Sequence, residues 1–216
     1  VGGPSSLKER AYIALKSAIL SLDLKPGQAL VESDLAEQLG VSKTPVRDAL
    51  QELEREGFVV RVPYKGTYVA QVNWKDIEEI FQLRAVLEGL AVRLATLRLT
   101  ADDWEKGERL LARAQEALAQ GDRELCSRLG RQFHKLFIRK ADNQRLASIM
   151  YNLEDHLQRF RRMSDQIGGR LEKSQEEHRR VLEAVKQRNA LLAEEAMRSH
   201  MHSVLRDLSE EQPHEG

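Results

Sequence analysis

The chain lacks the features that mark secreted and membrane proteins. Its single cysteine, Cys126, leaves no internal disulfide and fits a reducing compartment. No run of apolar residues is long enough to span a membrane, and the first residues lack the apolar core of a signal peptide. We therefore expect a cytoplasmic protein with no membrane partner.

An excess of charge of one sign is also absent. Lys plus Arg and Asp plus Glu both total 34, and residues 1–73 are balanced as well. Any binding to nucleic acid must therefore come from the local placement of basic side chains. The 216 residues, 41% of them hydrophobic, suffice for one large or two modest domains with cores of their own.

The stretch GVSKTPVRDALQELEREG, residues 40–57, predicts a short helix with both ends marked. Ser42 can cap the first amides, and Gly57 suits the left-handed position after the last turn. At about 100° per residue, one side of this helix is apolar and an adjacent side is polar. The polar side is either an ordinary solvated face or a reader of the DNA major groove, because cations at a helix N-terminus reach phosphates and guanine edges. The apolar side holds Val46, Ala49, Leu50 and Leu53, and the polar side holds Lys43, Thr44, Arg47 and Gln51.

The neighbouring segments favour the DNA-reading alternative. Apolar residues at helical spacing cover residues 7–22, and SDLAEQLG predicts a short helix capped by Ser33 and ended by Gly40. After the quoted helix, FVVRVPYKGTYVAQV predicts a β-hairpin around Pro-Tyr-Lys-Gly. A helix, a helix-turn-helix and a hairpin in this order predict a winged helix over residues 1–73, with Lys65 at the tip of the wing.

These residues resemble the DNA-binding domain of the GntR family of bacterial transcription regulators. The resemblance rests on PG, LAEQLGVS, TPVRDAL, L-x-x-EG and the G-T-x-V wing, in one stretch of about 50 residues. Ser33 stands where some relatives carry an arginine that contacts DNA, so that contact is expected to be absent. The resemblance implies DNA contacts from Ser42, Lys43, Thr44 and Arg47 in the reader helix and from Lys65 and Gly66 in the wing.

From Trp74 onward the strand signals disappear. Amphipathic patterns predict helices at about 75–97, 101–119, 122–140, 143–163, 172–188 and 191–209. Thr100 with Asp103, and Asp122, are suitable caps. The predicted fold is therefore mainly α: an N-terminal winged helix-turn-helix, and an all-α antiparallel bundle over residues 74–216. The interior of such a bundle is where ligand and metal sites are built.

Arg84 falls in the middle of an apolar stripe of the first bundle helix. An arginine on a core-facing stripe needs a partner. Glu88, one turn further on, is one alternative. The other is the carboxylate of a ligand in the bundle, which a guanidinium binds with two hydrogen bonds.

Three histidines, His134, His178 and His200, fall on the apolar faces of three different helices. Any one of them alone is typical of a hydrogen-bonded core histidine. Together they could meet at one point and bind a divalent transition metal such as Zn, Ni or Mn. His156 lies among charged residues and is expected at the surface.

The same residues resemble the FadR-type C-terminal ligand domain, an all-helical fold of the FCD group. The resemblance covers residues 76–205 and rests on R-x-x-L-E at 84–88, F-H at 133–134, E-H at 177–178 and the histidine at 200. It implies a metal held by these three histidines and by an aspartate one turn before the first. Gly130 stands at the aspartate position, so water or an effector carboxylate completes the site, or the site is lost.

Taken together, these patterns predict a metabolite-responsive transcription regulator that binds a palindromic DNA operator as a homodimer. An organic acid held in the bundle, with Arg84 as a contact, would change its affinity for DNA. Two alternatives remain: a metal-free sensor of acyl or organic acids, and a hydrolase with a three-histidine metal. No HExxH or nucleophile motif accompanies the histidines, so we expect no enzyme.

Overall fold

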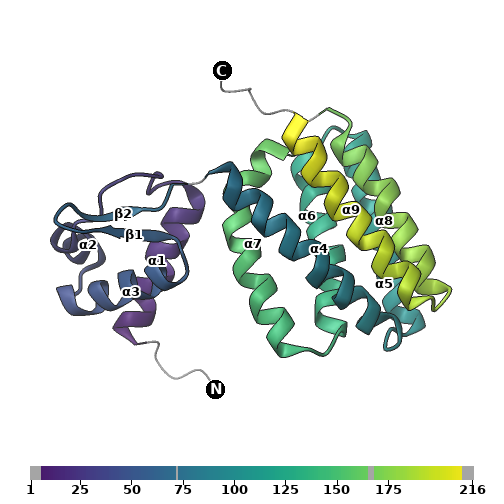
Figure 1. Ribbon diagram of the computed structural model, residues 1–216, viewed down its shortest axis with the longest axis horizontal. Helices are drawn as coiled ribbons and strands as arrows, with labels where there is room; N and C mark the ends of the chain where they lie inside the picture. Colours follow the sequence, from purple (N-terminus) through teal and green to yellow (C-terminus); the bar gives the residue numbers. More distant parts are fainter. Residues whose placement is uncertain (1–5, 72, 165–167, 211–216) are drawn as a thin grey trace. The chain divides into compact units, whose positions relative to one another are not determined.

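The computed structural model describes residues 6–71, 73–164 and 168–210. The chain divides into two compact units, Val1–Trp74 and Lys75–Gly216, one residue beyond the boundary expected from the sequence. The first unit contains α1 (Leu7–Ser21), α2 (Glu32–Leu39), α3 (Lys43–Arg55), β1 (Val59–Val62) and β2 (Gly66–Val69). The second contains α4 (Trp74–Thr96), α5 (Ala101–Ala119), α6 (Arg123–Lys140), α7 (Gln144–Ser164), α8 (Arg170–Lys186) and α9 (Ala190–Glu210) (Figure 1).

The first unit is a winged helix-turn-helix, as predicted. The two strands pair antiparallel, from Val59 opposite Val69 to Val62 opposite Gly66, and form the wing. A bridge between Ala29 and Tyr68 adds the segment before α2 to the edge of this hairpin. The helices and the hairpin share one apolar core, whose fully buried members include Ile19, Val46, Leu50, Leu53 and Phe58.

The ends of the helix-turn-helix agree with the sequence signals in part. Gly40 and Gly57 adopt left-handed φ angles of 64° and 79°, which glycine reaches without steric cost. The prediction that Ser33 caps α2 is wrong, because the helix begins at Glu32 and Val31 occupies the cap position. Ser42 does stand at the cap of α3, but its side chain makes no capping hydrogen bond.

The second unit is an all-helical bundle, which confirms the predicted fold class. α5 packs against α6 and α8, and α8 packs against α9. Its core includes the fully buried Phe133 and Phe137 of α6, Val181 and Val185 of α8, and Met197 of α9. The expected capping box of Thr100 and Asp103 is present, and Asp122 accepts from the Leu125 amide. α8 begins two residues earlier than predicted, and residues 165–167 of the preceding break lie outside the described ranges.

Candidate DNA interface and metal centre

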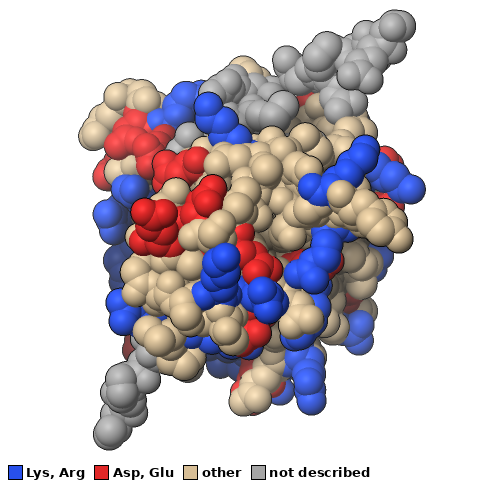
Figure 2. All heavy atoms as spheres, turned by 90° about the vertical axis from the view of Figure 1, so that its left-hand side faces the viewer, with Lys and Arg blue, Asp and Glu red and all other residues tan. Residues whose placement is uncertain are grey.

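The reader helix α3 presents the expected polar face to solvent. Ser42, Lys43, Thr44 and Arg47 are all exposed, whereas its apolar side is buried in the core of the first unit. Because the buried face holds the helix in place, its exposed N-terminal end is accessible to a partner such as a groove of DNA. The face drawn in Figure 2 carries basic and acidic side chains side by side, so no uniformly basic surface covers it.

Arg47 is held by Glu32, a residue that the sequence reading did not single out. Its Nε donates to Glu32 Oε2 at 3.1 Å and its Nη2 to the same oxygen at 2.8 Å. The hydrogen bond from Arg47 is the main cause that lowers the pKa of Glu32. The side chain of Arg47 is still 59% exposed, so the pair orients the guanidinium without hiding it.

The tip of the wing places Lys65 and Gly66 in solvent. Gly66 has a φ of 121°, a conformation that strongly favours glycine. The Tyr68 hydroxyl donates to the Lys65 carbonyl at 2.9 Å and so ties the tip to β2. Tyr64, beside them, is fully exposed. The wing is therefore a fixed turn that carries a cation.

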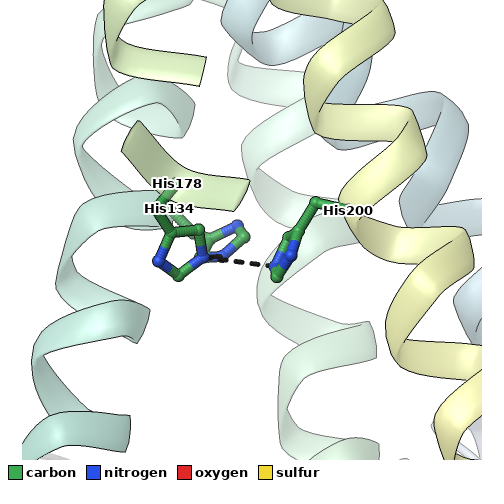
Figure 3. A group of neighbouring side chains, drawn as sticks. All are labelled: His134, His178 and His200. Atoms are coloured by element: carbon green, nitrogen blue, oxygen red, sulfur yellow. Dashed lines mark hydrogen bonds between the residues drawn. The ribbon is translucent and has the colours of Figure 1, made fainter. Parts of the chain in front are cut away.

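His134, His178 and His200 meet inside the bundle, one each from α6, α8 and α9 (Figure 3). The Nε2 atoms of His134 and His178 are 2.9 Å apart, and those of His178 and His200 are 3.2 Å apart. All three residues are buried, with exposed fractions of 9% or less. The three histidines therefore lie together, as their positions on three different helices predicted.

The far side of two of these rings faces a carboxylate. His134 Nδ1 pairs with Glu88 of α4, and His200 Nδ1 lies 2.7 Å from a Glu177 oxygen. An ionised carboxylate only accepts hydrogen bonds, so it places the ring proton on Nδ1 and leaves the Nε2 lone pair free. The lone pairs of His134 and His200 are thereby directed toward the third histidine.

A buried arginine stands behind each carboxylate. Arg84 donates from Nε to Glu88 at 2.8 Å, which realises one of the two alternatives left open for it. Arg170 pairs in the same way with Glu177, and also with Asp207. Burial alone would raise the pKa of Glu88 and of Glu177. The pKa of Glu88 is nevertheless lowered, because the charges of Arg84 and then of His134 outweigh the effect of burial. For Glu177, the bond to His200 is the main opposing cause, and the pKa falls to about 2.

The cluster fits a divalent transition metal. An ion 2.0–2.1 Å from each nitrogen in tetrahedral geometry would separate the nitrogens by about 3.4 Å, close to the spacing of the Nε2 atoms. Desolvation by burial lowers the pKa of His178 well below its ordinary value and that of His200 to about 4. The rings of His178 and His200 are thus neutral at pH 7, which is the form that binds a metal. His178 Nδ1 has no hydrogen-bond partner within the described ranges, and in the metal-bound form it would carry the ring proton so that Nε2 is free for the ion.

A cavity of about 110 Å³ adjoins the three histidines. Its lining includes Arg84, Arg170, Cys126, Gly130 and Gln175. Gly130 offers no ligand atom, and a Cβ built there would lie 3.4 Å from the Cε1 of His178. The space that an aspartate would occupy therefore belongs to the cavity.

Comparison with known proteins agrees with both units. Residues 7–69 match the family described as "Bacterial regulatory proteins, gntR family", and residues 79–203 match the FCD domain. The chain belongs to the GntR family of bacterial transcription regulators. It is 32% identical to the HTH-type transcriptional regulator YdhC of Bacillus subtilis, over 88% of this chain and 85% of that protein. This GntR-family chain is thus a regulator and not the hydrolase considered above.

Two further relatives extend the comparison over nearly the whole chain. A probable D-xylose utilization operon transcriptional repressor of Paenarthrobacter nicotinovorans is 31% identical, over 91% of this chain and 85% of that protein. The structure of McbR/YncC of Escherichia coli superposes with a TM-score of 0.73 at 27% identity, covering 95% of this chain and 98% of that one. The winged helix and the bundle of this GntR-family protein therefore occur together in a solved regulator structure.

Several residues of the two sites were missed or set aside by the sequence reading. Glu32, Glu177, Arg170 and Gln175 were not assigned to a site, although Glu177 stands in the quoted E-H pair. His156 is partly exposed and is not a member of the histidine cluster. No helix in the described ranges has the length and apolar character needed to cross a membrane.

Proposed function

We propose that this GntR-family chain binds a palindromic operator as a homodimer and releases or retains it according to a small carboxylate effector in the bundle. The convergence of three buried Nε2 atoms beside a cavity lined by three arginines, Arg84, Arg131 and Arg170, carries this proposal. Two-fold operators match two-fold proteins, which supports the dimer. Since one relative is described as a probable repressor, we propose that DNA binding represses transcription here as well.

His134, His178 and His200 would hold a divalent metal in this site, with zinc or nickel suited best to imidazole ligands. The metal would supply a Lewis-acidic positive charge that binds an anionic oxygen. Because Gly130 contributes no carboxylate, the three neutral imidazoles leave that charge uncompensated. An effector carboxylate would therefore bind more tightly in the presence of the metal, and the metal more tightly in the presence of the effector.

Arg84 would contact the other end of the anion. Arg84 lines the cavity, and its ion pair with Glu88 holds the guanidinium there. Its N–H groups would donate hydrogen bonds to the anion. The size of the cavity argues against the acyl-sensor alternative. A cavity of 150 Å³ holds a benzene molecule, so about 110 Å³ suits a short acid rather than a long acyl chain.

Elemental analysis tests the metal. Full-length protein purified without chelators or a nickel column should contain about one divalent ion per chain, and His178→Ala should lose it. His202→Ala is the matched control, because His202 lies on α9 outside the cluster and is exposed. Wild-type protein that carries no metal, and takes up none at micromolar zinc or nickel, would leave only a metal-free sensor.

Binding to DNA tests the reader helix. Arg47→Ala should weaken binding to the operator roughly ten- to hundredfold, since it removes a base or phosphate contact. Arg55→Ala removes the same charge from the far end of α3, where the side chain is also exposed, and should have a much smaller effect. Footprinting of the DNA upstream of the gene and its neighbours supplies the operator for both titrations. Equal losses in the two variants would mean that the N-terminal end of α3 does not read the DNA.

A further inference from the structure

Gln175 brings an unpaired hydrogen-bonding atom to the cavity. The residue is 5% exposed, and its Nε2 lies 3.7 Å from the Sγ of Cys126. Its Oε1 is buried and has no hydrogen-bond partner within the described part of the chain. A buried polar atom without a partner is costly, and most such atoms in native proteins have a specific explanation. Both Gln175 and Cys126 line the cavity beside the histidines.

One polar atom of the Gln175 amide is left without a partner in either orientation of the amide. If its oxygen and nitrogen exchange places, one of them still meets Cys126 and the other is left unpaired. A hydroxyl group both donates and accepts, so a hydroxyl satisfies the unpaired atom in either orientation. A carboxylate can only accept and an ammonium can only donate, so each satisfies one orientation alone.

The unpaired amide lies within reach of a ligand that also meets the histidines. Gln175 precedes His178 by one turn of α8, and Cys126 precedes Gly130 by one turn of α6. One turn of a helix rises about 5.4 Å, which is the span of a chain of a few carbon atoms. Gly130 has no side chain to close the space between the two levels. A short molecule can therefore place a carboxylate at the histidine level and a hydroxyl at Gln175.

We infer that the effector is a short hydroxy acid and that Gln175 is the residue that recognises its hydroxyl group. The inference rests on the proposed function, because the carboxylate end is assigned to the metal. The cavity of about 110 Å³ limits the acid to roughly four to six non-hydrogen atoms, by comparison with a cavity of 150 Å³ that holds the six carbons of benzene. Gln175 then selects among acids of this size by their hydroxyl group.

Calorimetric titration of the full-length, zinc-loaded protein tests this inference with two matched pairs of acids. The pairs are glycolate with acetate and lactate with propionate, and the members of each pair differ only in the hydroxyl group. At least one hydroxy acid should bind about five- to tenfold more tightly than its partner, the contribution expected of one hydrogen bond. The same titrations on protein stripped of zinc should show weaker binding of every acid.

Gln175→Leu should abolish the preference and leave the affinity for the acid without a hydroxyl nearly unchanged. Because the change removes a buried unpaired polar atom and keeps the volume, thermal unfolding should show no loss of stability. Gln175→Met serves the same purpose if the branched side chain is not accommodated. Gln187→Leu is the matched control, since Gln187 ends the same helix and is exposed. It should keep the wild-type preference.

Three outcomes would overturn the inference, and only the last of them would also overturn the proposed function. Equal binding of both members of every pair, with binding still dependent on zinc, would refute the hydroxy acid and leave the proposed function intact. A preference that survives in Gln175→Leu would show that another residue reads the hydroxyl. Failure of all four acids to bind, with or without zinc, would overturn the carboxylate effector and with it this inference.

Discussion

Glu88→Gln should weaken metal binding and destabilise the metal-free protein at the same time. The Glu88 side chain is 2% exposed and lies between Arg84 of its own helix and His134 of α6. Gln keeps the shape of the residue but loses the charge that neutralises Arg84 and fixes the tautomer of His134. Two separate measurements follow from these two contacts.

The expected magnitudes come from the position of the carboxylate. Carboxylates that orient a ligating histidine contribute about ten- to hundredfold to metal affinity, so the dissociation constant for zinc should rise by that factor. Removing one partner of a buried ion pair costs about 3–5 kcal/mol when the other charge is left uncompensated, but the charge of Glu154 also acts on Arg84. The isosteric amide still accepts a hydrogen bond, so the lower end, about 3 kcal/mol, is expected for the free energy of unfolding.

A second substitution separates the two effects. In the double variant Arg84→Met, Glu88→Gln, the buried arginine is gone, so most of the lost stability should return while zinc affinity stays low. Glu79→Gln is the control on the same helix, because Glu79 pairs with Lys75 in solvent and its side chain is 59% exposed. Zinc affinity is read by competition with a chromophoric chelator, and stability by urea unfolding of the metal-free protein. Wild-type zinc affinity in Glu88→Gln would refute the role of Glu88 in orienting His134.

Four other outcomes can be measured on the same protein. Lys65→Ala should flatten the salt dependence of operator binding by about one unit of slope, because the wing loses one phosphate contact; an unchanged slope would remove the wing from the DNA backbone. Glu32→Gln should lower the ratio of operator to random-DNA affinity, since the Arg47 guanidinium loses the partner that orients it, and an unaltered ratio in competition titrations would contradict this. Gly130→Asp should strengthen zinc binding without effector and weaken acid binding in calorimetry, because the new carboxylate takes the place of the anion. Desolvation by burial lowers the pKa of His200 to about 4, so the metal-free unfolded chain binds more protons than the native one between pH 6.5 and 4. Stability should therefore fall across this range as the pH decreases, by about 3 kcal/mol, and a flat urea midpoint would disprove it.

Local signals in the sequence were sufficient to place the helices. Apolar spacing and short-range caps act within a few residues, so they can be read before the fold is known. The capping box of Thr100 and Asp103 and the left-handed Gly57 illustrate this. Ser33 shows the limit of these local signals, because Val31 and not Ser33 occupies the cap position of α2. The backbone amide of Leu30, just before Val31, donates to the carbonyl of Thr67 in the wing, and this contact lies far away in the sequence.

The sequence by itself also determined which side chains had to be explained, since arginine and histidine on apolar stripes require partners. Only the tertiary structure decided what those partners are. Glu88 and His134 lie 46 residues apart and Arg170 and Asp207 lie 37 apart, so no periodicity along the chain connects them. The physical reason is that apolar periodicity and most caps depend on neighbours in sequence, whereas the direction of an imidazole lone pair depends on a carboxylate brought against it by another helix.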